Sequence, residues 1–252
     1  MIKKLLPFLI LLAACSQDYD YSHIKVIRVI DGDTVKLENG ENLRYIGLDT
    51  PETRIKKNNR FIYAPQPFAL DAKRLNQKLV ENKYIKIEFD VEKKDIYGRL
   101  LGYCFVGNTF INAKLIEEGF AVTFTIPPNV KYIDTFIALQ RAAREAKKGM
   151  WGAYETINAK DCPKYVNQIR TVKGRIKDSY QAKKFISLNF DTSGSEKVKI
   201  VIFENSYDAF RKKGIDPLNF YIGKTIEVSG KIRQYKQYTE IIVSNPEEIT
   251  LP

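Results

Sequence analysis

Short runs in which hydrophobic and polar residues alternate recur along the chain, and Gly, Asn, Asp and Pro separate them. In the first half these runs are rich in β-branched residues, a pattern typical of half-buried strands. The predicted strands span residues 23–30, 34–38, 42–48, 84–89 and 99–106. Asn39-Gly40, between the second and third strands, is a strong signal for a two-residue hairpin.

Segments whose hydrophobic residues have helical spacing lie between these predicted strands. Phe68, Ala72, Leu75 and Leu79 fall on one face of a helix that begins after Pro67. Further helices are predicted over 111–118 and 132–146, whereas 49–66 is predicted to be a polar loop. Five strands with interspersed helices favour a small barrel of the OB type.

A second strand-rich block follows residues 153–164, which lack apolar periodicity and are predicted to be a linker. Its predicted strands are 169–176, 185–191, 198–203, 225–232 and 239–243, with a helix over 206–213. The expected fold class is therefore mainly β with helices (α+β), with two five-stranded OB-fold barrels. The first barrel domain spans 23–152 and has about three helices, and the second spans 165–252.

The N-terminus has a different pattern. Positive residues at 1–4 precede an apolar run over 5–12 that is too short for a bilayer core of about 30 Å. The run ends in Leu12-Ala-Ala-Cys15, which resembles a bacterial lipoprotein signal. We expect a signal peptide at 1–14, a tether at 15–22, and a lipid on Cys15 that anchors the protein in the cell envelope. In a cell with two membranes, we expect the anchor in the outer membrane, facing the periplasm. A plain secretory signal is the alternative.

Lys and Arg number 41 and Asp and Glu number 30, a net charge of +11 that favours a polyanionic partner such as nucleic acid. A merely soluble basic protein would have the same balance. With His23 as its one histidine, the chain cannot form a site with two histidine ligands. Three cysteines exclude a multi-disulfide scaffold. Outside the reducing cytosol, Cys104 and Cys162 could pair or remain free thiols.

Polar clusters lie at the ends of the predicted strands. In a three-strand meander, Asp33 at one strand end lies beside Asp49 at another, so two carboxylates can converge on a hard cation such as Ca²⁺. Glu52 can reach an adjacent water, and Arg44 and Arg99 offer planar guanidinium groups to phosphate oxygens. Taken singly, these motifs are ordinary turns or surface ion pairs. Together they are typical of metal-assisted phosphodiester hydrolysis.

The motifs Ile30-Asp-Gly-Asp-Thr-Val35, Arg44 with Asp49-Thr-Pro-Glu52, and Asp95-Ile-Tyr-Gly-Arg99 resemble those of the micrococcal (staphylococcal) nuclease-like family, the thermonucleases, over about residues 24–152. The resemblance implies that Asp33, Asp49 and the Thr50 carbonyl hold Ca²⁺, with Asp31 supporting them from behind. It also implies that Glu52 is the general base, that Arg44 and Arg99 bind the scissile phosphate, and that Tyr97 hydrogen-bonds a substrate phosphate. The implied products carry 3′-phosphate ends.

Two positions depart from the family pattern. Ile96 replaces a lysine, and the stretch Thr123-Phe-Thr-Ile-Pro127 lacks the tyrosines that contact the nucleotide. Phe124 can replace their stacking but not a hydroxyl contact.

The second block resembles the C-terminal OB-like domain appended to some bacterial thermonuclease-like proteins. The resemblance is carried by Val172-Lys-Gly-Arg-Ile176, Ile186-Ser-Leu-Asn-Phe190, Gly223-Lys-Thr-Ile-Glu-Val228 and Asn245-Pro-Glu-Glu-Ile249. Basic segments that contain Tyr180, Tyr235 and Tyr238 suit single-stranded nucleic acid. Ordinary hairpin packing is the alternative for these tyrosines.

We therefore predict a monomeric, exported, lipid-anchored, Ca²⁺-dependent nuclease that cleaves DNA and RNA, single strands preferentially, with low sequence specificity. The alternative is a non-catalytic envelope protein whose OB barrels bind nucleic acid or a protein partner, since OB folds host both functions.

Overall fold

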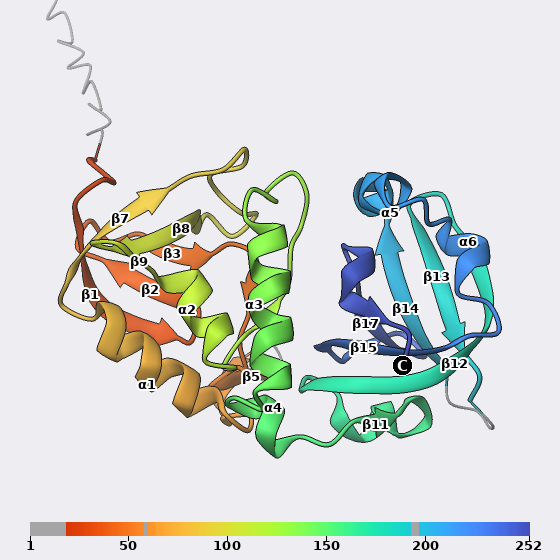
Figure 1. The fold of residues 1–252 in the computed structure, drawn as a ribbon. Helices are drawn as coiled ribbons and strands as arrows, with labels where there is room; N and C mark the ends of the chain where they lie inside the picture. The colour runs from red at the N-terminus through yellow and green to blue at the C-terminus, as the bar shows by residue number, and fades with distance from the viewer. Residues whose placement is uncertain (1–18, 58–59, 193–196) are drawn as a thin grey trace, which may run out of the picture.

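The computed structural model describes residues 19–57, 60–192 and 197–252. Two β-barrels lie side by side, with helices around the first (Figure 1). The predicted class, mainly β with helices, is confirmed. Among the described residues, none of the helices has the length and apolarity to cross a membrane. The predicted signal peptide and Cys15 lie outside the described residues.

The first barrel closes in the strand order β1-β2-β3-β8-β7, with β7 returning to β1. Strands β3 and β8 are parallel, and the other neighbours are antiparallel. The strands are β1 (Ile24–Asp31), β2 (Thr34–Leu37), β3 (Asn42–Tyr45), β7 (Tyr84–Glu88) and β8 (Leu100–Val106), extended by β9 (Thr109–Phe110). Alternate residues such as Val26, Val35 and Leu43 fill the core, as the sequence pattern predicts.

The predicted strand 42–48 is interrupted, because Gly47 passes directly over the ring of Phe136. A Cβ at Gly47 would lie 2.3 Å from that ring, and its φ of 86° also favours glycine. The chain resumes as β4 (Leu48–Asp49), which pairs with β10 (Val122–Thr123) outside the barrel. This break lets Asp49 leave the barrel wall.

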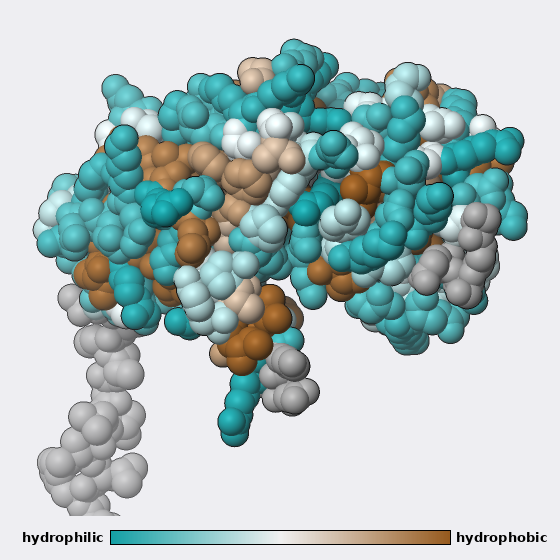
Figure 2. Space-filling model, turned by 90° about the horizontal axis from the view of Figure 1, so that it is seen from below, coloured by the Kyte–Doolittle hydropathy of each residue, from teal (hydrophilic) through white to brown (hydrophobic). Residues whose placement is uncertain are grey.

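The predicted polar loop 49–66 is wrong in part, since it contains a hairpin of β5 (Arg54–Lys57) and β6 (Arg60–Tyr63). Figure 2 shows the hairpin projecting from the face seen from below, with hydrophobic side chains at its surface. Phe61 and Tyr63 are both exposed. Because the hairpin buries neither face, it lacks the alternation by which a strand is recognised.

Helices cover the first barrel. They are α1 (Ala69–Val80), α2 (Ile111–Glu117), α3 (Ile133–Glu145) and α4 (Met150–Ala153). On α1, Ala72 is buried, and Leu75 and Leu79 pack against the core, as their spacing predicts. Phe136 on α3 is fully buried against the same core.

The second barrel repeats the strand order of the first. β12 pairs with β13, β13 with β14, β14 in parallel with β17, and β15 with β12. The strands are β11 (Ile157–Asn158), β12 (Ile169–Gln181), β13 (Phe185–Phe190), β14 (Lys197–Phe203), β15 (Thr225–Lys231), β16 (Arg233–Tyr235), β17 (Tyr238–Ile242) and β18 (Ile249–Thr250). The helices are α5 (Tyr207–Lys212) and α6 (Pro217–Phe220), with 3₁₀ turns at Ala159–Tyr165, Glu204–Ser206 and Pro246–Glu248.

Part of the predicted linker 153–164 packs on the second barrel. Ala159 and Cys162 are buried in its core. Cys104 is buried in the first core, and both cysteines are free thiols. The question left open by the sequence is thus answered in favour of two separate thiols.

An apolar cluster and an ion pair join the two barrels. Val122 and Met150 of the first barrel domain pack with Ile169 of β12, and these three residues are called the interface cluster below. Arg144 on α3 forms an ion pair with Glu227 on β15 at 3.6 Å. The second barrel is therefore fixed against the side of the first from which Asp49 emerges.

A candidate active site at the junction of the barrels

The turn that holds Asp33 and the loop that follows Asp49 are tied together. Thr50 donates hydrogen bonds from its backbone N–H and its hydroxyl to Asp33 Oδ2, at 3.1 and 2.9 Å. Gly32 permits this approach, because a Cβ at that position would lie 2.6 Å from Thr50 Oγ1. The tight turn between β1 and β2 therefore fixes the position of the Asp33 carboxylate beside Thr50.

Asp31 braces the loop from the other side. Its Oδ2 accepts hydrogen bonds from the backbone N–H and the hydroxyl of Thr53, at 3.2 and 3.0 Å. Burial raises the pKa of the Asp31 carboxyl, and the neighbouring Asp33 raises it further. Asp31 thus supports the loop without joining the ion pairs described next.

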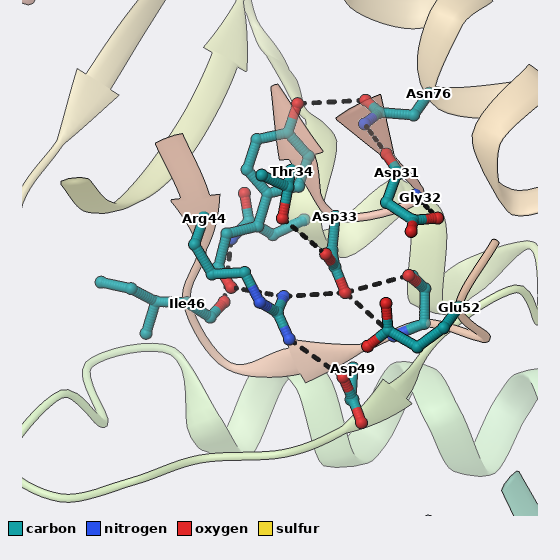
Figure 3. A network of polar contacts seen from close by, with 12 residues as sticks. Asp31, Gly32, Asp33, Thr34, Arg44, Ile46, Asp49, Glu52 and Asn76 are labelled. Atoms are coloured by element: carbon teal, nitrogen blue, oxygen red, sulfur yellow. Dashed lines mark hydrogen bonds and ion pairs between the residues drawn. The ribbon is translucent and has the colours of Figure 1, made fainter. Parts of the chain in front are cut away.

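Arg44 lies between the two carboxylates that the sequence assigns to a metal (Figure 3). Its Nη1 is 2.9 Å from Asp33 Oδ2, and its Nη2 is 3.0 Å from Asp49 Oδ1. All three side chains are largely buried. Removing the guanidinium group or one of the carboxylates would leave a buried charge poorly compensated, so the stability of each of the three side chains depends on the other two.

The oxygens of this cluster suit a hard cation. Asp49 Oδ2 is buried, and no hydrogen-bond donor in the described part of the chain reaches it. The carboxylates of Asp33 and Asp49 are the two that could contact a metal ion here. Within residues 19–57, 60–192 and 197–252, no three or more His, Cys, Asp or Glu side chains form a group that could hold a metal. A cation bound here would need backbone oxygen and water as further ligands, which Ca²⁺ tolerates.

Glu52 lies at the edge of the same cluster. Its backbone N–H donates to Gln66 Oε1 at 2.9 Å, which fixes the start of the loop. Burial, and to a lesser extent the nearby Asp33, raise the pKa of the Glu52 carboxyl to about 7, although Lys231 lowers it.

A cavity of about 690 Å³ opens beside these groups and is called the junction cavity below. Its lining includes Arg44, Asp49 and Glu52 together with the predicted substrate residues Tyr97 and Arg99. Asp95 Oδ2 holds Arg99 Nε at 2.7 Å, and Tyr97 is 78% exposed. The cavity thus brings together five of the predicted site residues, while Asp31, Asp33 and Thr50 lie behind its wall.

The second barrel supplies two cavity residues that the sequence analysis did not place in the active site. Lys231 Nζ lies 3.0 Å from Glu52 Oε1 and 3.7 Å from Asp49 Oδ2. Arg233 lies over the ring of Phe124, 4.9 Å from its centre. Nothing in the local sequence around Lys231 marks it, because its proximity to Glu52 depends on how the barrels dock.

Comparisons with known proteins agree with this geometry. The family model "Staphylococcal nuclease homologue" matches residues 42–153, which end before the second barrel. A thermonuclease from Staphylococcus hyicus is 39% identical over 130 residues, covering 50% of this chain and 74% of the relative. Endonuclease YncB from Bacillus subtilis is 39% identical over 134 residues, covering 51% of this chain and 61% of the relative. The chain therefore belongs to the staphylococcal nuclease family.

Proposed function

We propose that this chain is a Ca²⁺-dependent nuclease that hydrolyses phosphodiester bonds of DNA and RNA with low sequence specificity and leaves 3′-phosphate ends. Membership of the staphylococcal nuclease family supports a nuclease. The observation that carries the proposal is the convergence of Arg44, Asp49, Glu52 and Arg99 on one cavity, with Asp33 directly behind. Carboxylates and guanidinium groups in one wall are suited to hydrolysis of a phosphodiester.

Each side chain has a distinct task in this proposal. Asp33, Asp49 and the Thr50 carbonyl would hold Ca²⁺, which supplies positive charge at the phosphoryl oxygens when bound. Arg44 and Arg99 bind the scissile phosphate and offset the charge of the transition state. Glu52 accepts a proton from the water that attacks phosphorus.

The attack forms a new P–O bond and breaks the bond to the 5′-oxygen, which takes up a proton from solvent. The phosphate then stays on the 3′-oxygen. Tyr97, exposed at the rim of the junction cavity, hydrogen-bonds a phosphate of the same strand.

We further propose that the second barrel binds a single strand. A cavity of about 610 Å³ on this barrel is lined by aromatic and basic side chains, called the aromatic face below: Lys177, Tyr180, Phe185, Lys197, Lys199, Tyr235, Lys236 and Tyr238. Tyr180 is 62% exposed and Tyr235 is 54% exposed, which supports stacking with bases over hairpin packing. Lys199 Nζ lies 4.2 Å from the centre of the Tyr238 ring.

The proposed location rests on the N-terminal sequence alone. Positive residues, an apolar run and Cys15 support export and lipid anchoring, at the outer membrane if the cell has two membranes. We propose that the protein acts there as a monomer.

Incubation of purified protein with single-stranded DNA, duplex DNA and RNA tests the proposal. Each substrate is tested with Ca²⁺ and with a chelator. Cleavage that requires Ca²⁺ and yields 3′-phosphate ends is the expected result. Tight binding without cleavage under any divalent cation would favour the alternative, a non-catalytic envelope OB-fold protein.

A further inference from the structure

Lys231 enters the junction cavity as a poorly solvated cation. Its side chain is 16% exposed. A lysine ammonium has three donors, and in the part of the chain that the structure describes Lys231 Nζ donates one hydrogen bond, to Glu52 Oε1. Asp49 Oδ2 attracts the ammonium from 3.7 Å without a hydrogen bond. The side chain therefore keeps donor capacity for a further anion inside the cavity.

The two barrels are also joined by contacts that do not involve Lys231. The interface cluster, the ion pair of Arg144 with Glu227, and a hydrogen bond between Thr125 and Ser244 all join the barrels elsewhere. Lys231 itself lies at the end of β15, opposite Ile169 of β12. Because Ile169 is also part of the interface cluster, the ladder that fixes the interface also fixes the position of Lys231.

The cations of the cavity come from both barrels. Arg44, Lys94 and Arg99 belong to the first, and Lys231 and Arg233 belong to the second. Arg233 lies over Phe124 of the first barrel domain, so an aromatic ring and a guanidinium group lie together where the two barrels meet. Positive groups supplied by both barrels suit a polyanionic strand that runs between the barrels.

We propose that Lys231 is a substrate-binding residue of the active site, supplied by the second barrel, whose ammonium binds the phosphodiester held beside Glu52. This inference rests on the proposed nuclease function. The unused donors of the ammonium form charge-assisted hydrogen bonds to phosphate oxygens, while the contact with Glu52 keeps the carboxylate beside the same phosphate. The second barrel is then part of the catalytic unit and not only an appended binding module.

Three variants of the full chain test this inference: Lys231→Met, Lys231→Arg and Lys173→Met. Lys173 lies on β12, outside the junction cavity, and pairs with Glu227 at 3.6 Å. Its loss removes an equal charge from the second barrel and leaves Glu227 its ion pair with Arg144. Cleavage of a single-stranded oligonucleotide with Ca²⁺ gives kcat and KM. Anisotropy of the labelled oligonucleotide with a chelator gives the dependence of log affinity on log salt.

Lys231→Met is expected to lower kcat/KM by about 10- to 100-fold, the effect of losing a hydrogen bond to a charged group. The slope of log affinity against log salt concentration should become shallower by about 0.7, the value for one lost phosphate contact on a single strand. Lys231→Arg should retain part of both properties, and Lys173→Met should match the wild type.

Unchanged or increased kcat/KM in Lys231→Met would overturn the inference, because Lys231 would then be a surplus contact or a latch that blocks the site. An unchanged salt dependence together with a lower melting temperature would overturn it as well, in favour of a purely structural contact. If the wild type does not cleave at all, the proposed function fails, and the salt dependence still decides whether Lys231 binds phosphate.

Discussion

Thr125 Oγ1 of the first barrel domain lies 2.6 Å from Ser244 Oγ of the second, and both hydroxyls are buried. Ser244 is itself held by Glu248, whose Oε1 and Oε2 accept hydrogen bonds from the Ser244 hydroxyl and backbone N–H at 2.9 and 3.0 Å. A polar chain thus crosses the interface close to the junction cavity. The chain that follows β10 is therefore joined to the second barrel by buried hydrogen bonds.

Thr125→Val removes this hydrogen bond at nearly constant side-chain volume. We expect the free energy of unfolding to fall by about 1 kcal/mol, the usual net value of a hydrogen bond, and the melting temperature to fall by about 2–4 °C. Thr109→Val, at an exposed position on β9, is the matched control. Equal melting temperatures for Thr125→Val and the wild type would show that the hydroxyl pair contributes nothing to docking.

The stability of the protein should depend on the protonation of Glu248. Burial raises the pKa of this carboxyl to about 7, and the hydrogen bonds from Ser244 offset only part of that effect. An unfolded glutamate has a pKa of about 4.3, so between about pH 4.3 and 7 the folded state keeps a proton that the unfolded state releases. The contribution of Glu248 to stability therefore falls as the pH rises through this window.

Urea unfolding of the wild type and of Glu248→Gln at several pH values measures that contribution. Relative to that of Glu248→Gln, the free energy of unfolding of the wild type should fall by up to about 1.4 kcal/mol per pH unit between about pH 4.5 and 7. Above that range the difference should level off. A wild type that gains stability over the variant as the pH rises would mean that the carboxylate is stabilised in the fold.

Arg44 should stabilise the metal-free protein, because it neutralises Asp33 and Asp49 at 2.9 and 3.0 Å. Arg44→Met leaves the buried Asp33 without an ion pair among the described residues and leaves Asp49 with Lys231 alone, at 3.7 Å, so we expect a loss of about 3–5 kcal/mol in the free energy of unfolding in the presence of a chelator. Ca²⁺ should restore much of this loss, since the cation then binds without displacing a guanidinium group.

Thermal unfolding of Arg44→Met with chelator and with Ca²⁺ checks this prediction. The control is Arg74→Met, which removes an exposed surface ion pair with Asp71. That variant should behave like the wild type in both conditions. If Ca²⁺ leaves the stability of Arg44→Met unchanged, Asp33 and Asp49 do not form a cation site.

The aromatic face of the second barrel should bind bases by stacking. In a Glu52→Gln background, which prevents cutting, Tyr235→Ser should weaken binding of a single-stranded oligonucleotide by about tenfold, corresponding to about 1–3 kcal/mol per stacked base. Tyr84→Ser, which removes an exposed ring of the first barrel stacked on His23, is the control. Equal affinities for the two variants would exclude the aromatic face from substrate binding.

The sequence predicted the barrel strands well, because one face of each strand is buried and hydrophobic and polar residues therefore alternate along it. It did not predict the break at Gly47, since the reason lies in Phe136, far along the chain. It also missed the hairpin that contains Phe61 and Tyr63, because exposed strands lack alternation.

The same contrast holds for the site. Asp33, Arg44 and Asp49 lie at neighbouring strand ends, so local motifs and simple topology bring them together. Lys231 was missed because its position depends on the docking of two separately folded barrels, and no local spacing encodes that contact.

Hydrolysis of a single-stranded oligonucleotide by Glu52→Gln, compared with the wild type under saturating Ca²⁺, tests most directly whether the junction cavity is the nuclease site. Glutamine keeps the size of the side chain and removes its ability to accept a proton. We expect kcat to fall by at least about 100-fold, the lower range for loss of a general base, with little change in substrate affinity. A Glu52→Gln variant that cleaves at the wild-type rate would contradict the assignment of the chemistry to this cavity.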